Sequence, residues 1–380
     1  YRATRDEQHL TRGRANTLRL ALSGQLGAAG IASPEVIAAL DLCVSCKGCK
    51  RECPTGVDMA RMKIEFLAQY RKRHGATLRD RLIAYLPRYA PWAARLAPIA
   101  NGASRALRKP LGFSVRRELP AWRSNYFVDR VRPKRGSREL VLLVDTFNRY
   151  FEPENARAAV RVLEAANCRV HLAQPRFGER PLCCGRTFLA AGLVEDARRE
   201  ARRLVEALQP FLEYEVPVVG LEPSCLYTLR DEYTVLLPEA KALASRALML
   251  EEFLVQEANA GRLEVKFKPL EQEALLHGHC HQKAFAAMGA VESALRLVPG
   301  LKVSTIESSC CGMAGSFGYE AEHYEVSMKM GELALLPAVR NAGDDALIVA
   351  DGTSCRHQIA DGTGRQALHV ARVLAQALQD

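Results

Sequence analysis

One succession of strands and helices occurs twice in this 380-residue chain, from residue 138 onward. In the first copy "ELVLLVDTF", "RVHLA" and "VPVVGLEPSC" have the pattern of strands, and in the second copy "EALLHGHCH", "LKVSTI" and "ALIVADGTSC" do. Helical apolar patterns separate the strands in both copies. Because alternating strands and helices favour a parallel sheet covered by helices, we predict an internal duplication of one α/β unit.

Cysteines follow the predicted strands of both copies. Ligands of parallel α/β sheets bind beyond the carboxyl ends of the strands, so cysteines there are well placed to hold a metal. Adjacent cysteines seldom form a disulfide with each other, because a bridge requires Cα atoms about 5.5 Å apart. In the second copy we predict a metal or cluster site of four cysteines: Cys280, Cys310, Cys311 and Cys355. The alternative is a set of buried, inert thiols.

The first copy has a less complete set of cysteines. Thr146 stands where the second copy has Cys280, which leaves three candidate ligands: Cys183, Cys184 and Cys225. The first copy therefore offers a metal one thiolate fewer than the second. Cys168, in "NCRVHLA", lies in a buried-strand pattern, and we predict that it belongs to the core.

Four histidines accompany the cysteines of the second copy: His277, His279, His281 and His357. Such side chains can tune a cluster through hydrogen bonds to sulfur, or relay protons to a bound quinone. The alternative is that they are loop histidines with hydrogen bonds of their own. Arg186 and Arg356 each follow a cysteine closely and are candidates for offsetting the charge of a cluster.

A dense cysteine run, "CVSCKGCKRECP", precedes both copies. Its spacing, C-x2-C-x2-C-x3-C-P, is typical of bacterial ferredoxins, whereas a zinc site usually consists of two separated C-x2-C pairs. We predict that four cysteines of the run bind [4Fe–4S] clusters: Cys43, Cys46, Cys49 and Cys53. In two-cluster ferredoxins the fourth cysteine ligates the other cluster, so Cys53 is expected to serve a different cluster from the first three. The sequence contains no second run of this kind.

The predicted protein has several domains. Residues 1–75 are expected to form a small all-α ferredoxin-like domain, and residues 76–137 a basic linker with short helices interrupted by prolines. Residues 138–262 and 263–380 are expected to form the two duplicated α/β domains with parallel sheets.

The distribution of charge and apolar residues limits the kinds of partner that this chain is expected to bind. The formal net charge is +10, but residues 71–138 contain 18 Lys and Arg against 3 Asp and Glu, so the rest of the chain is slightly acidic. This basic segment is interpreted as a solvated connector or as a docking site for an acidic partner or an anionic membrane face. Few aromatic residues lie among its arginines and no nucleic-acid motif is present, so nucleic-acid binding is not expected. No run approaches the roughly 18 apolar residues of a membrane span, and the first residues do not resemble a signal peptide.

The cysteine run and the two "CCG" copies together resemble a known family plan. The combination is similar to the iron–sulfur subunit of glycolate oxidase and to the C-terminal half of FAD-linked D-2-hydroxy-acid dehydrogenases of the D-lactate and D-2-hydroxyglutarate kind. The phrases "CVSCKGCKRECPTGVDMARMK", "HGHCHQKA" and "SSCCGMAGSFGYE" carry most of the likeness to the fused dehydrogenases. Similar doublets occur in heterodisulfide reductases, anaerobic glycerol-3-phosphate dehydrogenase subunits and lactate-utilisation proteins.

The resemblance implies an oxidoreductase module that transfers electrons through [4Fe–4S] clusters. FAD and the hydroxy-acid site would lie on a separate flavin dehydrogenase domain or subunit, and the acceptor would be a quinone or another carrier. The expected location is the cytoplasm, with peripheral contact to the inner face of the cell membrane as an option. The alternative is a protein of the heterodisulfide-reductase type, in which the clusters of the repeats act on thiols or disulfides.

The family resemblance also bears on where this sequence starts. In the fused relatives a first cysteine run ends in Cys-Pro just before "SYRAT" or "TYRAT", and this sequence begins at that Tyr. We therefore expect the sequence to be part of a longer chain whose preceding run supplies the remaining cluster ligands.

Overall fold

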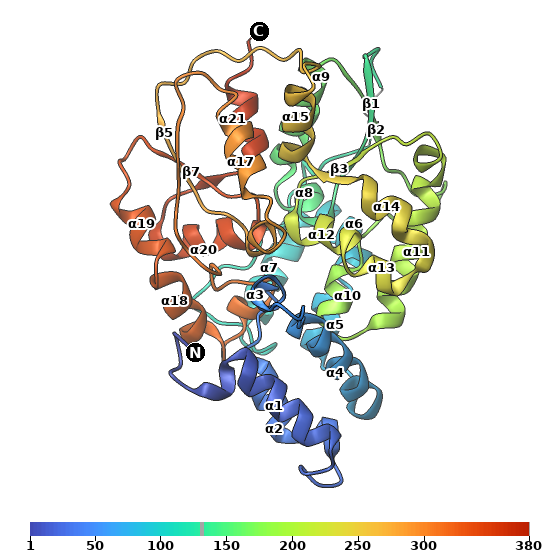
Figure 1. The fold of residues 1–380 in the computed structure, drawn as a ribbon, viewed down its shortest axis with the longest axis vertical. Coiled ribbons are helices and arrows are strands. Elements are labelled where there is room, and N and C mark those ends of the chain that lie inside the picture. The colour runs from blue at the N-terminus through green and yellow to red at the C-terminus, as the bar shows by residue number, and fades with distance from the viewer. Residues whose placement is uncertain (130–132, 380) are drawn as a thin grey trace.

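The computed structural model describes residues 1–129 and 133–379. Two α/β domains lie side by side, and a helical N-terminal region lies beneath both of them (Figure 1). The first α/β domain is coloured green to yellow in Figure 1, and the second is coloured orange to red. The predicted duplication of a parallel α/β unit is therefore confirmed.

Each α/β domain contains one four-stranded parallel sheet. The first sheet has the order β2-β1-β3-β4, and the second has the order β6-β5-β7-β8, so the two follow the same topology. The strands of the first sheet are β1 (Arg138–Leu143), β2 (Cys168–Leu172), β3 (Val218–Gly220) and β4 (Ala247–Met249). The strands of the second sheet are β5 (Glu273–Leu276), β6 (Lys302–Thr305), β7 (Leu347–Val349) and β8 (Ala367–Leu368).

The fourth strand of each sheet was not predicted from the sequence. We expected helices alone from about residue 239 and from about residue 366, but β4 precedes the helix in the first copy and β8 precedes it in the second. These strands are three and two residues long, which is too short for an alternating pattern to be visible. They form because the edges of β3 and β7 supply parallel hydrogen-bonding partners.

Helices flank both sheets. Those of the first domain are α8 (Thr146–Tyr150), α9 (Pro153–Ala165), α10 (Arg186–Ala190), α11 (Val194–Leu212), α12 (Pro223–Arg230), α13 (Tyr233–Leu236), α14 (Lys241–Arg246) and α15 (Leu250–Asn259). Those of the second are α16 (Cys280–Ala284), α17 (Met288–Leu295), α18 (Tyr324–Glu332), α19 (Leu335–Asn341), α20 (Thr353–Thr363) and α21 (Val370–Gln376).

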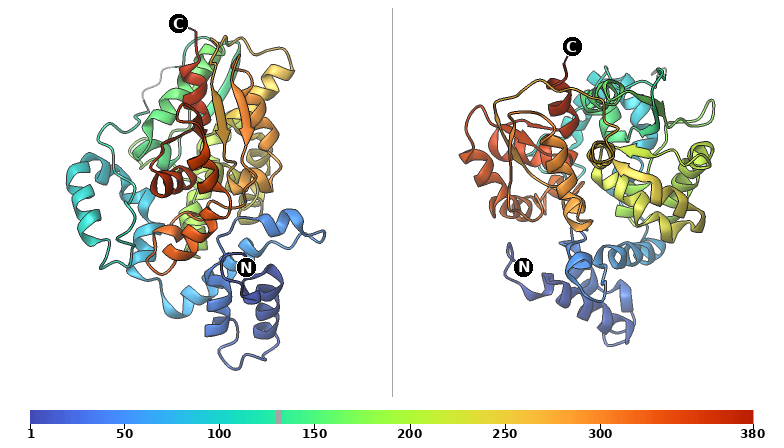
Figure 2. Two further views of the ribbon diagram at one scale, coloured as in Figure 1. Left: turned by 90° about the vertical axis from the view of Figure 1, so that its left-hand side faces the viewer. Right: turned by 45° about the horizontal axis from the view of Figure 1, so that its top comes forward.

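The two α/β domains share one hydrophobic core. Helix α21 packs against α9 and helix α17 packs against α15, so elements of one domain meet elements of the other. Apolar side chains from both sheets, such as Leu140 of β1 and Leu276 of β5, belong to one buried cluster. Cys168 of β2 also lies in this cluster, which agrees with its predicted place in the core. Figure 2 shows the close approach of the two domains from two further directions.

The N-terminal region is helical, as the apolar spacing predicts. Its main helices are α1 (Thr11–Leu22), α2 (Pro34–Asp41), α3 (Gly48–Glu52) and α4 (Met59–His74). The basic segment then continues as α5 (Leu78–Ala84), α6 (Leu86–Arg95) and α7 (Ala97–Leu107). The cysteine run occupies the connection from α2 through α3 to α4, which places it at the junction with both α/β domains (Figure 1).

Candidate metal centres at the junction of the domains

The four candidate cysteines of the second domain come together at the carboxyl ends of its strands. Cys280 begins α16 after β5, the doublet Cys310–Cys311 follows β6, and Cys355 lies in the first turn of α20 after β7. The last three thiols are buried, and Cys280 is half-buried. One ring nitrogen of His277 and the sulfurs of Cys311 and Cys355 lie within 4.8 Å of one another. This group of side chains is called the second-domain centre below.

The second-domain centre favours thiolates. The pKa of Cys311 is lowered well below its usual range, first by a hydrogen bond with Cys310 and then by one with Cys355. A hydrogen bond with Cys310 also lowers the pKa of Cys280 to about 6, against the effect of burial. The pKa values of Cys310 and Cys355 are raised in turn, because each thiol donates a hydrogen bond to an ionised neighbour. Thiolates are the form of cysteine that binds metals.

The first domain brings its three cysteines together in the same way. Cys183, Cys184 and Cys225 are all buried, and their thiols are hydrogen-bonded in series. The hydrogen bond with Cys184 lowers the pKa of Cys225, but burial outweighs this effect and raises the pKa to about 12. Thr146 begins α8 as Cys280 begins α16, so the predicted replacement of one cysteine by threonine is correct in space. We refer to this group as the first-domain centre.

A glycine closes the cysteine doublet of each domain. The backbone N–H of Gly185 donates to Cys183 Sγ at 3.3 Å, and that of Gly312 donates to Cys310 Sγ at 3.4 Å. Both glycines have positive φ, 79° and 95°. A Cβ at Gly312 would lie 2.2 Å from the carbonyl oxygen of Ser327. The doublet thus requires glycine both for its turn and for the close approach of the neighbouring backbone.

The cysteine run surrounds a cavity of about 250 Å³. Cys43, Cys46 and Cys49 line this cavity, whereas Cys53 ends α3 and is not among the lining residues. The second domain contributes Ser309, beside the Cys310–Cys311 doublet, to the lining, together with apolar side chains of α18 and the turn after it. The cavity therefore lies between the run and the second domain.

The loop around Cys46 has an unusual backbone. Ser45 and Lys47, on either side of it, both have left-handed conformations, with φ of 51° and 59°. Non-glycine residues in this region are strained, and such strain persists where the surroundings fix the loop. Burial, and next the nearby charge of Cys280, raise the pKa of Cys46 to about 12.

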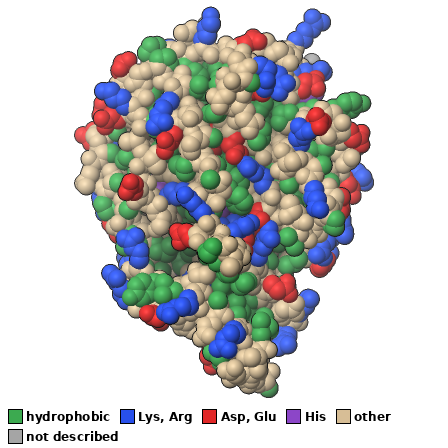
Figure 3. Space-filling view, in the orientation of Figure 1, with side chains coloured by type: hydrophobic (Ala, Val, Ile, Leu, Met, Phe, Trp, Pro, Cys, Tyr) green, Lys and Arg blue, Asp and Glu red, His purple; other side chains and the backbone are tan. Residues whose placement is uncertain are grey.

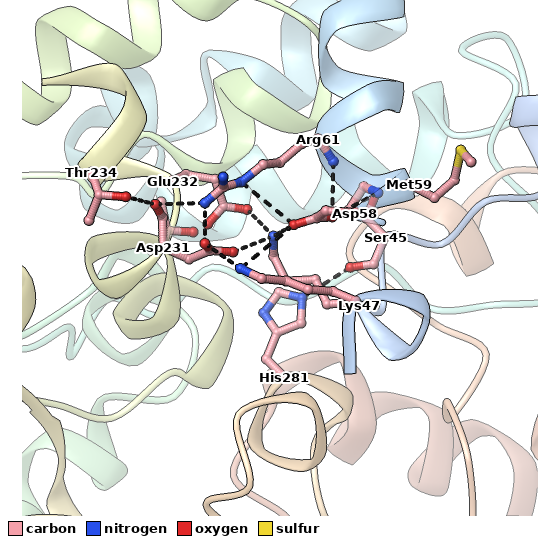
Figure 4. Close-up of polar contacts among 12 residues, drawn as sticks. Ser45, Lys47, Asp58, Met59, Arg61, Asp231, Glu232, Thr234 and His281 are labelled. Carbon is pink, nitrogen blue, oxygen red and sulfur yellow. Dashed lines mark hydrogen bonds and ion pairs between the residues drawn. The ribbon is translucent and has the colours of Figure 1, made fainter. Parts of the chain in front are cut away.

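A buried ion cluster fixes this loop on the first domain (Figure 4). Lys47 Nζ lies 2.7 Å from Asp231, 3.0 Å from Glu232 and 3.1 Å from Asp58. Lys50 Nζ contacts Asp231 at 2.6 Å, and the Arg61 guanidinium also pairs with that carboxylate. The carboxylates raise the pKa of Lys47, although burial alone would lower it. Sequence reasoning missed this cluster, because two of its acidic members, Asp231 and Glu232, belong to the segment after α12.

The second domain holds the same loop through a histidine. His281 Nε2 lies 3.1 Å from the carbonyl oxygen of Ser45, one residue before Cys46 (Figure 4). His279 Nδ1 accepts the backbone N–H of His281 and so caps α16. His357 Nδ1 is 2.5 Å from the hydroxyl of Tyr319. All four predicted histidines thus have polar partners, since His277 Nδ1 lies 2.9 Å from Ser308 Oγ.

The two candidate arginines are paired with carboxylates. Arg186 contacts Glu232 at 3.1 Å. Arg356 pairs with Glu152 of the first domain and donates to the carbonyl oxygens of Ala350 and Asp351. Both arginines therefore join parts of the chain, and neither stands as a free positive charge beside the thiols.

The donor sets fit an iron–sulfur cluster. Three cysteines face one cavity at the run, and four buried or half-buried cysteines meet in the second-domain centre, whereas the first-domain centre has three. The assignment of individual ligands stays a prediction, as does the ferredoxin-like character of residues 1–75. Figure 3 shows Lys and Arg side chains gathered around the hollow where the N-terminal helices meet the α/β domains.

Helices α6 and α7 carry exposed apolar side chains. Trp92, Leu96 and Ile99 are each more than half exposed, and the Arg95 guanidinium stacks on the Trp92 ring. Among residues 1–129 and 133–379, none of the helices combines the length and the apolar character needed to cross a membrane.

Comparison with known proteins assigns the two α/β domains to a family. Residues 146–230 and 274–360 each match the cysteine-rich domain CCG. The chain is 30% identical over 234 residues to a subunit of the anaerobic glycerol-3-phosphate dehydrogenase of Escherichia coli (strain K12), a match that covers 61% of this chain and 57% of that protein.

Two further relatives match different shares of this chain. D-2-hydroxyglutarate dehydrogenase of Escherichia coli (strain K12) is 24% identical over 372 residues, which span 91% of this chain and 35% of the relative. Lactate utilization protein A of Bacillus licheniformis is 28% identical over 238 residues, which span 59% of this chain and 93% of the relative. The chain thus spans little more than half of the glycerol-3-phosphate dehydrogenase subunit and about a third of the hydroxyglutarate dehydrogenase.

Proposed function

We propose that this chain is a component of an oxidoreductase, because its two α/β domains match the cysteine-rich domain CCG and its relatives are dehydrogenases and their subunits. From that premise we propose that it is the iron–sulfur electron-transfer module of an FAD-linked D-2-hydroxy-acid dehydrogenase. Its substrate class would be D-lactate, D-2-hydroxyglutarate or glycolate. Electrons would leave the reduced flavin of a partner domain or subunit and reach a quinone or another carrier through this chain.

The arrangement of the thiols supports the proposal. The cavity lined by Cys43, Cys46 and Cys49 is also lined by Ser309 of the second domain. The charge of Cys280 acts on Cys46, so the run and the second-domain centre share one electrostatic environment. Adjacent cluster sites are what single-electron transfer between them requires. This adjacency is the observation on which the proposal chiefly rests.

The chain's residues have distinct parts in this function. Cys43, Cys46 and Cys49 would hold one [4Fe–4S] cluster, with Cys53 directed to another. A bound cluster supplies one-electron redox chemistry at a potential set by charge, hydrogen bonds and burial. The backbone N–H of Met59 donates to Cys49 Sγ at 3.4 Å, and such a bond stabilises the thiolate. Val326 and Met330 of α18 add apolar side chains to the lining of this cavity.

In the second domain the ligands would be the four cysteines of its centre: Cys280, Cys310, Cys311 and Cys355. The first-domain centre is proposed as a weaker site, because Thr146 replaces the fourth thiol. That replacement also disfavours the heterodisulfide-reductase alternative, which two complete centres would support. The exposed Trp92 and its neighbours on α6 and α7 fit peripheral contact with the inner face of the cytoplasmic membrane.

Iron and sulfide analysis tests the proposal. The double variant Cys310→Ser/Cys311→Ser should lose the iron and acid-labile sulfide of one cluster, together with its EPR signal, after anaerobic reconstitution. Cys168→Ser is the matched control, because Cys168 is equally buried but lies on β2 in the core. Unchanged iron and sulfide in the double variant would refute ligation by the second domain.

A further inference from the structure

His277 has a buried ring nitrogen without a hydrogen-bond partner. The residue directly follows β5 and is only 1% exposed. Its Nδ1 lies 2.9 Å from the hydroxyl oxygen of Ser308. Among the described residues, no group forms a hydrogen bond of ordinary geometry with its Nε2, although the ring also interacts with the Cys311 thiol. A buried nitrogen left in this state is unfavourable, and a ligand would offset that cost.

The surroundings of Ser308 determine which ring nitrogen carries the proton. Lys283 Nζ donates to Ser308 Oγ at 3.2 Å and to the carbonyl oxygens of Ser308 and Ser309 at 2.6 and 3.1 Å. The hydroxyl itself points to the carbonyl oxygen of Ile306 at 3.4 Å. Ser308 Oγ can therefore accept the Nδ1–H of His277, which leaves the Nε2 lone pair free.

The free nitrogen is beside thiols. A ring nitrogen of His277 lies within 4.8 Å of the sulfurs of Cys311 and Cys355. Since Nδ1 forms a hydrogen bond with the Ser308 hydroxyl, Nε2 is the nitrogen available to a metal. Histidine ligands of metals typically donate their other ring N–H to an oxygen atom, and the contact with Ser308 provides that oxygen.

The first domain shows that the fold does not need a histidine here. His277 lies three residues before Cys280, and the residue three before Thr146 is Leu143, which is also buried. The first domain therefore lacks both the imidazole and the fourth thiol at matching positions. Both donors occur together in the second domain, as expected if they serve one metal centre.

We infer that His277 is a metal ligand, with Nε2 completing a mixed imidazole–thiolate centre with Cys311 and Cys355. This inference rests on the proposed binding of an iron–sulfur cluster in the second domain, and it names a ligand that cysteine spacing does not predict. An imidazole ligand carries one negative charge fewer than a thiolate. The imidazole would stand in place of one of the four cysteines proposed above. Because replacement of a thiolate by histidine raises the potential of a cluster, a centre ligated by His277 accepts electrons more readily than one of four thiolates.

Pulsed EPR of the full chain tests the assignment. Protein labelled with ¹⁵N-histidine, reconstituted anaerobically and reduced, should show a strongly coupled nitrogen that changes with the isotope. His277→Gln should abolish this coupling, and His171→Gln, on β2 of the first domain, should leave it intact. His277→Cys should retain the cluster, remove the nitrogen coupling and lower the midpoint potential.

The outcomes separate this inference from the proposed function. If Cys310→Ser/Cys311→Ser removes a cluster but wild-type protein shows no isotope-dependent coupling, His277 is not a ligand and the proposed function stands. If the double cysteine variant keeps all its iron, the proposed cluster in the second domain is itself wrong. A coupling that persists in His277→Gln would also overturn the inference, with circular dichroism confirming that the variant is folded.

Discussion

Lys47 Nζ and the carboxylate of Asp231 meet at 2.7 Å, although 184 residues separate them in the chain. The Lys47 side chain is completely buried, and it lies between two cysteines of the run, Cys46 and Cys49. Asp231 directly follows α12, the helix that carries Cys225 of the first-domain centre. This buried ion pair is thus one of the contacts that link the cysteine run to the first domain.

Replacement of Lys47 by Met should destabilise the protein strongly. The variant leaves Asp58, Asp231 and Glu232 buried with less positive charge, and loss of one partner of a buried pair costs about 3–5 kcal/mol. Urea unfolding of the apoprotein measures this cost, and limited proteolysis should show cleavage in the released loop around Ser45.

Lys50→Met is the matched control for that variant. Lys50 contacts the same Asp231 carboxylate at 2.6 Å, but a third of its side chain is exposed, so water compensates for its loss. The expected cost is about 1 kcal/mol or less. Equal destabilisation by the two variants would contradict the role assigned to buried Lys47.

The pH dependence of stability should depend on His323. Burial lowers the pKa of His323. Hydrogen bonds with Asp41 of α2 and with Glu320 outweigh this effect and raise the pKa to about 9, above its ordinary 6.5. The contribution of this charged contact to the free energy of unfolding is therefore complete below about pH 6.5, and it is lost as the pH rises to about 9.

His323→Gln should lower the free energy of unfolding by roughly 1 kcal/mol at pH 6, because Asp41 is partly screened by water. The difference from wild type should shrink at pH 9.5. Asp41→Asn, which keeps the imidazole and its stacking on Phe317, should show the same trend. A difference that is constant between the two pH values would disprove the ionic coupling.

The repeat and the clustering of its cysteines were predictable because their signals are local. A strand pattern followed by cysteine places the thiol at a sheet edge, and the parallel topology then brings thiols from neighbouring strands together, as Cys311 and Cys355 show. Nothing in this local pattern separates His277 from His279 or His281, because their roles differ only in which atoms surround each ring.

Long-range pairing of charges was beyond sequence reasoning. Arginines of the basic segment pair with carboxylates of the α/β domains, which reduces the charge available to an external partner: Arg79 with Glu322, Arg88 with Asp196, and Arg117 with Asp361. Arg117 is even fully buried. Such pairs depend on which surfaces the fold brings together, and a count of charges along the chain does not contain that information.

Glu222 should be important for the contact between the two α/β domains. It follows β3 of the first domain, and its Oε2 accepts hydrogen bonds from the backbone N–H and the hydroxyl of Thr353, at 2.9 and 3.0 Å. Thr353 begins α20 of the second domain. Glu222→Ala leaves the Thr353 N–H buried without its acceptor, which should cost about 1–3 kcal/mol.

Hydrogen exchange at the start of α20 and urea unfolding measure the effect of Glu222→Ala. The Thr353 amide should exchange faster in the variant. Glu239→Ala, at an exposed position of the same domain, should change stability by less than about 0.5 kcal/mol. Unchanged protection of the Thr353 amide would show that another acceptor replaces the carboxylate.

Thr146→Cys should convert the first-domain centre into a stronger metal site. Thr146 is buried at the start of α8, in the position that Cys280 has at the start of α16. A cysteine there adds a fourth thiol to Cys183, Cys184 and Cys225 without enlarging the side chain appreciably. Each added thiolate contributes to a tetrahedral site, so Co²⁺ should bind on the order of tenfold more tightly or better.

Anaerobic titration of the apoprotein with Co²⁺ measures this gain, through the charge-transfer absorbance of cobalt–thiolate bonds. The titration uses a Cys310→Ser/Cys311→Ser background, so that the second-domain centre does not compete for the ion. Addition of Cys225→Ser to the Thr146→Cys chain should abolish the gain, because the set returns to three thiols. If Co²⁺ binds equally tightly with and without the new cysteine, residue 146 does not face the other thiols, and the correspondence between the two centres fails at that position.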